Sequence, residues 1–384
     1  MTSGPLEGVR IVELCSLITG PMATVMLADQ GAEVIKVEAP RGDIYRLTGT
    51  IRGGQAAMFM TVNRNKRSIV LDAKDPDQKE ALLTLISEAD VFIQNMKPGS
   101  AARLGLDPET LRAKFPRLIC ASVSGYGQTG PKAFEGAVDP MIQAISGIAA
   151  IQGGKKGDKP QLVRTLLPDK TTSMIIAQAI TSALFQRERT GQGCTVECAM
   201  LDAVVWWLWP DAMMNNTFVG KVESISDDVS EADWICKTDD GHLVVAPYQE
   251  GAWQTFTELV NRTELLDDPR FGSVSSRTGN LEAFTAVVRE SFAGKTTDEW
   301  CSFLQENGIP CAPVVKTEDI ASNPQVIWNK VVEELEHPSA GTYRSVRSPV
   351  LFDGVSSSVR RHSPGLGEHT SEISSEFGFE LPSD

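Results

Sequence analysis

Asp169 is the side chain in this sequence best suited to covalent chemistry. It follows Pro168 and opens a helical pattern that runs to Arg189 and closes at Thr190-Gly191. Its spacing also fits a helix N-cap, and the two roles are compatible, because N–H groups at a helix start hold a carboxylate in one place. A free Asp has a pKa of about 3.9, so the group is ionised near neutral pH. It can therefore attack an activated acyl group without a general base.

Other catalytic chemistries find little support. The four histidines lie outside any GxSxG or HExxH pattern, and the seven cysteines form no CxxC pair. The loop Ser16–Pro21 follows the first predicted strand but has one glycine where a dinucleotide fingerprint needs three, and no Walker A sequence occurs. These patterns argue against hydrolases of the serine and zinc types, nicotinamide enzymes and nucleotide triphosphatases. The unpaired cysteines favour a reducing, cytoplasmic location.

Basic residues are the second group with a possible function. Each lies in or beside a predicted junction of a strand and a helix, where ligands of open parallel sheets bind. Each is either an ordinary surface charge or part of a strip that binds phosphate. The residues are Arg64, Lys66, Arg67, Lys74, Lys97 and Arg103.

Strands alternating with helices over the first 125 residues predict an α/β fold with a parallel sheet covered on both faces. Helices are predicted to begin near Pro21, at Asp75-Pro76 and at Asp107-Pro108. Five strands are predicted in this part, at Val9–Leu14, Glu33–Glu38, Arg67–Asp72, Val91–Gln94 and Leu118–Val123, and a further one at Thr195–Met200.

The second half of the chain predicts a smaller α+β domain. A helix from Leu201 is expected to end at Pro210, and Asp240-Gly241 predicts a type I′ hairpin turn. Helices are expected near 253–260, 280–292 and 297–306. The predicted domains are 1–215 (first part of a large domain), 216–230 (linker), 231–325 (small domain) and 326–384 (a return segment completing the large domain).

Charge and hydropathy exclude two classes of partner. Lys and Arg total 36 against 50 Asp and Glu, a net charge of -14, which repels a nucleic-acid backbone. No apolar run reaches the roughly 18 residues of a membrane span. We therefore expect neither nucleic acid nor a membrane as a partner.

Several ordered blocks of the chain resemble family III CoA-transferases. They include the opening LEGVRIVELCSLITGPMATVMLADQGAEVIKVEAPRGD, then NRNKRSIVLD, VSGYGQTGP, Leu167-Pro168-Asp169, RERTGQG, GIPCAPV and LGEHT. The resemblance covers nearly the whole chain. It implies a large Rossmann-like domain built from both chain ends, a smaller inserted domain, and a homodimer of two interlocked rings.

The resemblance also implies the residues of the site. Asp169 falls on the family's catalytic aspartate, and Tyr248, Gln249 and Glu250 become substrate-binding candidates in the small domain. No tightly bound cofactor is implied, because coenzyme A enters as part of the acyl-CoA substrate. The residues implied to contact coenzyme A are Ile18, Thr19, Leu71, Asp72, Lys74, Asn95, Met96, Lys97, Arg103, Gly136 and Asp139.

The implied reaction moves CoA from an acyl-CoA to a free carboxylic acid through an aspartyl anhydride and an aspartyl-CoA thioester on Asp169. Relatives that handle oxalate often carry Gln where Ile18 stands, which argues against oxalate here. Racemases of 2-methylacyl-CoA, in the same superfamily, carry a histidine where this chain has Val138, although Glu250 could match their glutamate. A racemase and a non-catalytic CoA-binding homologue remain the alternatives.

Overall fold

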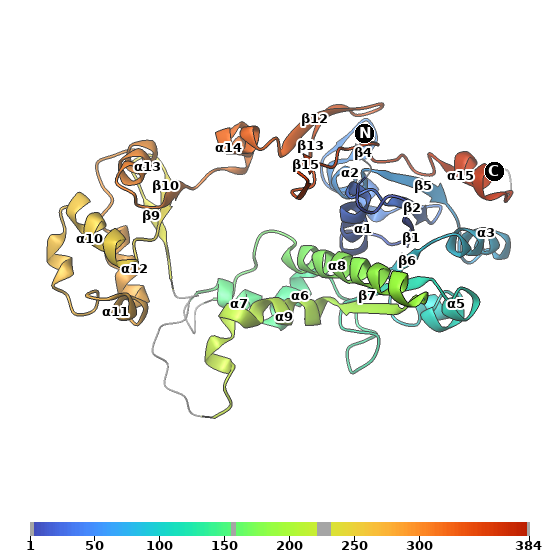
Figure 1. Cartoon of the computed structure of the whole chain (residues 1–384), viewed down its shortest axis with the longest axis horizontal. Helices are drawn as coiled ribbons and strands as arrows, with labels where there is room; N and C mark the ends of the chain where they lie inside the picture. The colour runs from blue at the N-terminus through green and yellow to red at the C-terminus, as the bar shows by residue number, and fades with distance from the viewer. Residues whose placement is uncertain (1–3, 155–158, 221–231, 382–384) are drawn as a thin grey trace. The chain divides into compact units, whose positions relative to one another are not determined.

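The computed structural model describes residues 4–154, 159–220 and 232–381, which form two compact units (Figure 1). One contains the described residues of 1–146, 164–205 and 324–384, and the other those of 147–163 and 206–323. Most of the predicted linker, residues 221–230, lies outside the described residues. In the described ranges no helix is long and apolar enough to cross a membrane.

A six-stranded sheet forms the centre of the first unit. All its strand pairings are parallel, and the order across the sheet is β5-β2-β1-β6-β7-β8. This confirms the predicted parallel α/β sheet. Its strands are β1 (Arg10–Leu14), β2 (Glu33–Glu38), β5 (Lys66–Val70), β6 (Val91–Gln94), β7 (Ile119–Ser124) and β8 (Thr195–Ala199).

The order of the strands locates a ligand site in general terms. From β1 the chain moves to β2 and β5 on one side, then returns to place β6 on the other side of β1. The crevice beyond the carboxyl ends of β1 and β6 is therefore a topological switch point, where open α/β sheets bind ligands.

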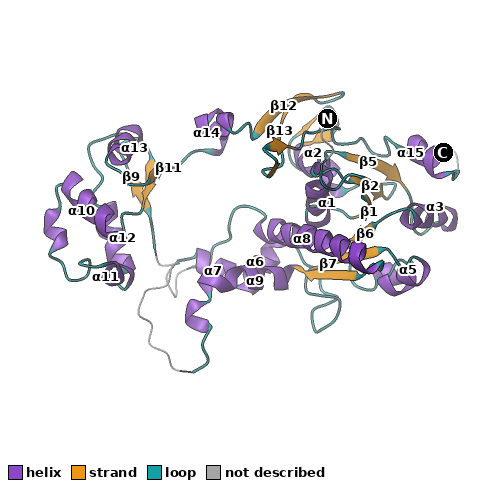
Figure 2. Cartoon of the chain, viewed as in Figure 1, coloured by secondary structure: helices purple, strands orange, loops and turns teal. Residues whose placement is uncertain are grey.

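Helices cover both faces of this sheet (Figures 1 and 2). Helices α1 (Thr19–Asp29) and α8 (Leu167–Thr190) pack on one face, where Leu27 and Ile180 are fully buried. The other face is covered by α3 (Pro76–Ser87), α5 (Pro108–Lys114) and α15 (Thr370–Phe377). Two apolar cores result, one on each side of the sheet.

Local sequence explains where several of these helices start and stop. Asp75 caps α3 by accepting the N–H groups of Asp77 and Gln78, and Asp107 caps α5 in the same way. Gly191 closes α8 with a φ of 72°, a left-handed conformation that glycine adopts without steric cost. These predictions are confirmed.

Three details of the helices differ from the predictions. Helix α1 begins at Thr19, so Pro21 is its third residue, where a missing N–H is still tolerated. Helix α8 begins at Leu167, which makes Asp169 its third residue and not its N-cap. Helix α9 (Met200–Ala212) does not end at Pro210 but continues past it.

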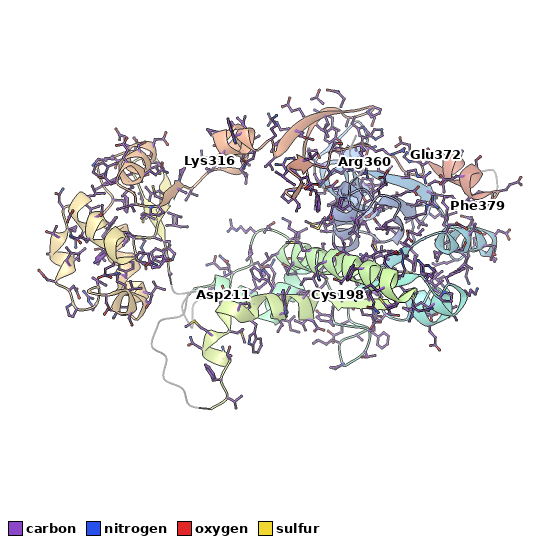
Figure 3. The ribbon with its side chains drawn as sticks, viewed as in Figure 1. Cys198, Asp211, Lys316, Arg360, Glu372 and Phe379 are labelled. Atoms are coloured by element: carbon purple, nitrogen blue, oxygen red, sulfur yellow. The ribbon has the colours of Figure 1, made fainter. Side chains whose placement is uncertain are left out.

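A C-terminal segment covers the β5 edge of the sheet. The backbone of Ser68 exchanges hydrogen bonds with His369, whose N–H donates to the Ser68 carbonyl at 3.0 Å and whose Nδ1 accepts from the Ser68 N–H at 3.3 Å. Arg360, labelled in Figure 3, donates to the Ala28 carbonyl at 2.7 Å. Phe379, labelled there too, packs on the core beneath α15.

Short elements complete the first unit. They are η1 (Ile44–Leu47), β3 (Ile51–Arg52), β4 (Gln55–Ala56), α2 (Ala57–Asn63), α4 (Ser100–Arg103), α6 (Asp139–Ser146), α14 (Pro324–Trp328), the hairpin β12 (Val332–His337) and β13 (Gly341–Val346), and β14 (Leu351–Phe352) with β15 (Val355–Ser356).

The second unit packs helices on a three-stranded sheet around an aromatic core that contains Trp253, Phe256 and Phe284. Its sheet has the order β11-β10-β9. Its elements are α7 (Ile148–Gln152), η2 (Met214–Asn216), β9 (Ile235–Lys237), β10 (His242–Val245), α10 (Glu250–Leu259), η4 (Thr263–Leu266), α11 (Val274–Thr278), α12 (Leu281–Arg289), α13 (Thr297–Glu306), β11 (Cys311–Pro313) and η5 (Thr317–Ser322).

The predicted hairpin between β9 and β10 is present, but its turn is not of type I′. Neither Asp240 nor Gly241 has the positive φ that this turn requires. The Asp240 carboxylate instead accepts the N–H and the hydroxyl of Thr297, each at 2.8 Å. The turn is therefore shaped by its contact with the start of α13.

Candidate functional site

A cavity of about 310 Å³ lies in the first unit at the switch point of the sheet. The loops after β1 and β6 meet there, because the Asn95 side chain accepts the Ser16 N–H at 3.0 Å and donates to the Ser16 carbonyl at 2.8 Å. The cavity is lined by Leu17, Thr19, Tyr45, Asn95, Val123, Ser124, Gly125, Ala137, Val138, Asp139, Pro140, Leu166, Asp169 and Met200.

Asp169 reaches this cavity from the first turn of α8. The Thr19 hydroxyl, at the start of α1, donates a hydrogen bond to its Oδ1. Burial raises the pKa of Asp169 above 3.8, the charge of Asp139 raises it further, and the Thr19 hydrogen bond opposes both. Although its pKa is raised, the half-buried carboxylate has the chemistry of an oxygen nucleophile.

Asp139 positions the start of α8. Its Oδ2 accepts the backbone N–H of Asp169 at 3.2 Å, and its Oδ1 accepts from Gln143 at 2.7 Å. Burial raises the pKa of Asp139, and these two hydrogen bonds work against that rise. The carboxylate thus performs part of the capping that Asp169 was expected to provide.

The loop between β1 and α1 is held in a strained shape by Asp43. Leu17 has a φ of 68°, a left-handed conformation that is uncommon for a residue with a side chain. Its N–H donates to both carboxylate oxygens of Asp43, at 3.1 and 3.2 Å. Asp43 also accepts the Tyr45 N–H at 3.0 Å, so one buried side chain fixes two walls of the cavity.

A cluster of fully buried charged side chains lies next to this loop. Lys36 Nζ lies 2.9 Å from Glu13 and 3.2 Å from Asp43, and Lys66 Nζ lies 2.7 Å from Glu13. Burial opposes the charge of Glu13, but the two lysines outweigh it and lower its pKa to about 2. For Lys66 burial prevails, and with the repulsion of Lys36 it lowers the pKa to about 8.

The predicted strip of basic residues divides into two groups. Lys74, Lys97 and Arg103 are exposed and follow the carboxyl ends of β5 and β6. Arg64 precedes β5 and Lys66 is its first residue, so both lie at the amino end of the strand, away from the carboxyl ends where ligands bind. There they are buried and paired, Arg64 with Asp29 and Lys66 with Glu13.

Arg67 is also removed from the strip, since it pairs with Glu33, Glu372 and Glu376. Arg64, Lys66 and Arg67 are buried and paired with carboxylates, so none of the three is either an ordinary surface charge or part of a phosphate-binding strip. The physical reason is their place in the strand, because they precede or open β5 whereas ligands of open parallel sheets bind beyond the carboxyl ends of the strands.

The other residues implied to contact coenzyme A lie in varied surroundings. The Leu71 side chain is fully buried, so its side chain is unavailable to a nucleotide. Asp72 accepts the Lys74 N–H at 3.0 Å, Met96 is half-buried, and Gly136 is exposed. Ile18 is buried beside Thr19 and does not line the cavity of Asp169.

The substrate-binding candidates belong to the second unit. Tyr248, Gln249 and Glu250 are exposed at the beginning of α10. Glu250 is paired with the buried Arg277 at 2.7 Å, and Arg277 also donates to the Tyr248 carbonyl at 2.9 Å. Their part in substrate binding stays a prediction.

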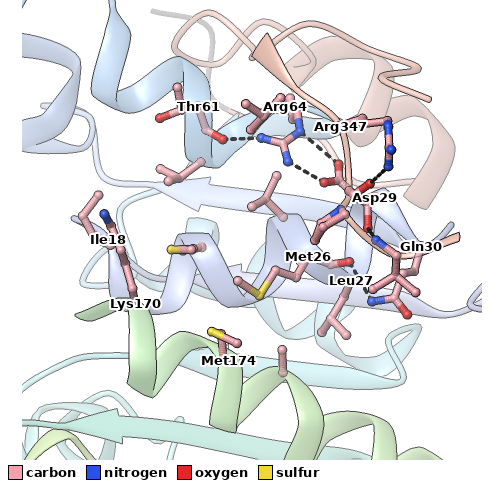
Figure 4. Close-up of a pocket in the computed structure, with 18 of the residues that line it drawn as sticks. Ile18, Met26, Leu27, Asp29, Gln30, Thr61, Arg64, Lys170, Met174 and Arg347 are labelled. Atoms are coloured by element: carbon pink, nitrogen blue, oxygen red, sulfur yellow. Dashed lines mark hydrogen bonds and ion pairs between the residues drawn. The ribbon is translucent and has the colours of Figure 1, made fainter. Parts of the chain in front are cut away.

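A larger apolar groove, about 970 Å³, runs between α1 and α8 in the first unit (Figure 4). Ile18 and Lys170 lie near one end, and Arg347 lies at the other. The lining includes Met26 and Met174, and Met174 is 61% exposed. We refer to this surface below as the α1–α8 groove.

Sequence reasoning did not single out Tyr45, Asp43 or Gln143. Asp43 ends the first quoted block, but nothing in its neighbours shows that it is buried. Within the described part of the chain, no group of three or more His, Cys, Asp or Glu side chains could hold a metal ion.

Comparisons with known proteins agree over almost the full length. Residues 6–370 match the profile of CoA-transferase family III. The mouse (Mus musculus) succinyl-CoA:glutarate CoA-transferase is 33% identical over 96% of this chain and 85% of its own. The formyl-CoA:oxalate CoA-transferase of Streptomyces coelicolor is 31% identical over 97% of this chain and 95% of its own.

Solved structures share the fold. A CaiB/BaiF family protein from Brucella suis superposes with a TM-score of 0.83 at 31% identity, covering 98% of this chain and 100% of its own. Rv3272 from Mycobacterium tuberculosis gives 0.83 at 30% identity over 96% and 99%. The profile match and these identities show that the chain belongs to CoA-transferase family III and is an enzyme that transfers CoA between carboxylic acids.

Proposed function

We propose that Asp169 is the nucleophile of this CoA-transferase. Its carboxylate oxygen attacks the carbonyl carbon of the donor thioester, the C–S bond breaks, and CoA leaves as a thiolate. The product on the enzyme is a mixed anhydride of Asp169 and the donor acid. The observation that carries this proposal is the Asp169 carboxylate in the switch-point cavity, held by the Thr19 hydroxyl.

Three further displacements complete the cycle. The thiolate attacks the aspartyl carbonyl and releases the donor acid, which leaves an aspartyl-CoA thioester. The acceptor carboxylate displaces the thiolate to form a second anhydride, and the thiolate then attacks the acceptor carbonyl and frees Asp169. Each step exchanges one activated acyl bond for another, so no net proton transfer and no ATP is needed.

We place the CoA substrate along the carboxyl edge of the large domain. Lys74, Lys97 and Arg103 are exposed at this edge, where their charges can meet phosphate groups in an otherwise acidic protein. The thiol end would lie near Thr19 and Asn95, which border the cavity. Leu71 would contribute through its backbone alone.

We also propose that the enzyme is an interlocked homodimer whose large domain includes the return segment from 326. The apolar α1–α8 groove and the exposed Met174 support an extensive subunit contact, since large exposed apolar patches commonly mark interfaces. Interlocked rings separate only on unfolding. Gel filtration should therefore give a dimer at every dilution, and a folded monomer would contradict the arrangement.

Relatives act on different acids, as the names succinyl-CoA:glutarate and formyl-CoA:oxalate show. The racemase alternative has less support. Val138 lines the cavity where the racemases carry a histidine, and Glu250 already pairs with Arg277. A two-base proton exchange therefore lacks one evident partner.

Mass spectrometry tests the proposed nucleophile. The wild-type enzyme incubated with succinyl-CoA, acetyl-CoA and other donors should gain a CoA adduct on the peptide that contains Asp169, and hydroxylamine should trap the same residue. Asp169→Asn should form no adduct and transfer no CoA. The control is Asp202→Asn, which replaces a carboxylate outside the cavity lining and should still form the adduct and transfer CoA. Normal transfer by Asp169→Asn would refute the mechanism.

A further inference from the structure

Tyr45 faces the cavity of Asp169 from a different element than the residues already discussed. It is the second residue of η1 and lines the cavity together with Thr19, Asp139 and Asp169. The charges of Asp169 and Asp139 act on the Tyr45 hydroxyl group. Because Tyr45 and Asp169 line the same cavity, they lie near each other in space, although 124 positions separate them in the numbering.

The backbone of Tyr45 is rigidly placed. Asp43 accepts its N–H at 3.0 Å, and the same carboxylate holds Leu17 on the opposite loop. The next residue, Arg46, donates to both oxygens of the buried Glu38, at 2.8 and 2.7 Å. Contacts on both sides thus fix the segment that carries the phenol, as a preorganised donor requires.

The other polar side chains of the cavity are already engaged. The Thr19 hydroxyl donates to Asp169, the Asn95 amide bonds the Ser16 backbone, and Ser124 Oγ accepts the Gly127 N–H at 3.1 Å. The residues that line the cavity include no lysine, arginine or histidine. Within the described residues, the Tyr45 hydroxyl makes no hydrogen bond in the structure.

Negative charge develops in this cavity at several points of the proposed cycle. Each tetrahedral intermediate carries an oxyanion, and the acceptor arrives as a carboxylate. Burial raises the pKa of Tyr45, and the nearby Asp169, Asp43 and Asp139 raise it further, so the phenol keeps its proton and donates. A preorganised donor aimed at a developing oxyanion stabilises the transition state, and the cavity lining has no cationic side chain that could do so instead.

We propose that the Tyr45 hydroxyl is a catalytic hydrogen-bond donor to the acyl oxygen of the group that reacts at Asp169. No proton is transferred in this role. The hydroxyl donates a hydrogen bond to the acyl oxygen as negative charge develops on that oxygen, and the hydrogen bond weakens when the carbonyl re-forms. The inference rests on the proposed function of Asp169, and it adds a residue from η1 to the machinery contributed by α1 and α8.

Tyr45→Phe removes the hydroxyl and keeps the ring. With the intact full-length enzyme, we expect kcat for CoA transfer to fall by about 10²–10³, the usual cost of one oxyanion donor. The KM for the CoA donor should change less than threefold, because the phosphates bind elsewhere. Formation of the Asp169 adduct should slow by the same factor as kcat.

Tyr343→Phe is the matched control, since Tyr343 lies in β13 and lines no part of this cavity. It should keep kcat within twofold of the wild type. Tyr45→His retains an N–H donor, so its kcat should be at least tenfold higher than that of Tyr45→Phe. Such a recovery would show that the loss in Tyr45→Phe does not come from misfolding. Thermal melting and circular dichroism check all three variants.

The outcomes separate this inference from the proposed function. If Tyr45→Phe keeps more than half of the wild-type kcat, or if Tyr45→His is no better than Tyr45→Phe, the role of the hydroxyl is refuted while Asp169 stands. If the wild type forms no adduct on Asp169 with any donor, the proposed function and this inference fail together.

Discussion

Replacing Lys36 by methionine removes one charge from the buried cluster beneath the catalytic loop. In the wild type, two carboxylates (Glu13 and Asp43) face two ammonium groups (Lys36 and Lys66), and all four side chains are essentially inaccessible to water. In Lys36→Met only Lys66 remains, and it pairs with Glu13. The fold then holds one uncompensated negative charge, and Asp43 loses its partner at 3.2 Å.

The magnitude follows from the burial of the group. Removing one member of a buried ion pair costs about 3–5 kcal/mol, because the remaining charge stays desolvated. At about 1.4 kcal/mol per factor of ten, this corresponds to opening equilibria roughly 10²–10⁴ times more favourable. The Met side chain retains the apolar part of lysine, so little of the loss comes from packing.

Hydrogen exchange followed by mass spectrometry measures this opening directly in the sheet unit. Peptides that cover β1 and β2 should exchange roughly 10²–10⁴ times faster in Lys36→Met, following the estimate above. The control is Lys132→Met, which removes an exposed lysine 2.8 Å from Glu135 and should leave the exchange of the sheet unchanged. CoA transfer should also fall, since Asp43 positions Leu17 and Tyr45.

Exchange of β1 and β2 within threefold of the wild type would refute the reasoning. It would mean that Asp43 and Glu13 are protonated or hydrated without Lys36, and that the cluster does not contribute to stability in the way its burial indicates.

Three further outcomes are expected. Thr19→Val removes the hydrogen bond that stabilises the ionised form of Asp169, whose pKa burial already raises. The acid limb of the kcat/KM profile should therefore move to higher pH in this variant. An acid limb at the wild-type pH would contradict the hydrogen bond. Lys97→Glu or Arg103→Glu should raise the KM of the CoA donor much more than that of the acceptor acid, and equal effects on both would assign these residues a structural role. Incubation with a 2-methylacyl-CoA in deuterated water should give negligible α-deuterium, because Val138 has no proton to exchange; rapid exchange without CoA transfer would favour a racemase.

The sheet could be predicted from the sequence because each of its strands has a strong local signal. Short β-branched runs bounded by Gly, Pro and Asp placed β2 and β6 with their observed bounds. The Asp-Pro pairs placed the starts of α3 and α5, since their caps depend on neighbours only. The strand order, which creates the switch-point cavity, depends on long-range packing and could not be derived in this way.

The site was predicted only in part. Asp169 and Thr19 were named, but their direct hydrogen bond spans 150 positions, and no local pattern encodes it. The buried lysines had a usable signal: Lys36 interrupts the apolar stretch of residues 34–37 in β2, and a charge inside a strand buried on both faces must have a partner. Tyr45 could not be identified from the sequence, because η1 is a single short turn with no pattern of its own. Its position depends on hydrogen bonds to Asp43 and Glu38.

The contact between Ser68 and His369 also affects how the protein is made. β5 is an edge strand, and His369, which binds its free edge at Ser68, lies 301 positions further along the chain. At about 5–20 residues per second, a ribosome needs roughly 15–60 s between these two points. For that time the nascent chain presents an uncovered strand edge, the kind of surface that recruits other strands. Chaperone dependence during synthesis should therefore be greater than the stability of the finished sheet indicates, and variants that weaken the His369 contact should lose yield before they lose specific activity.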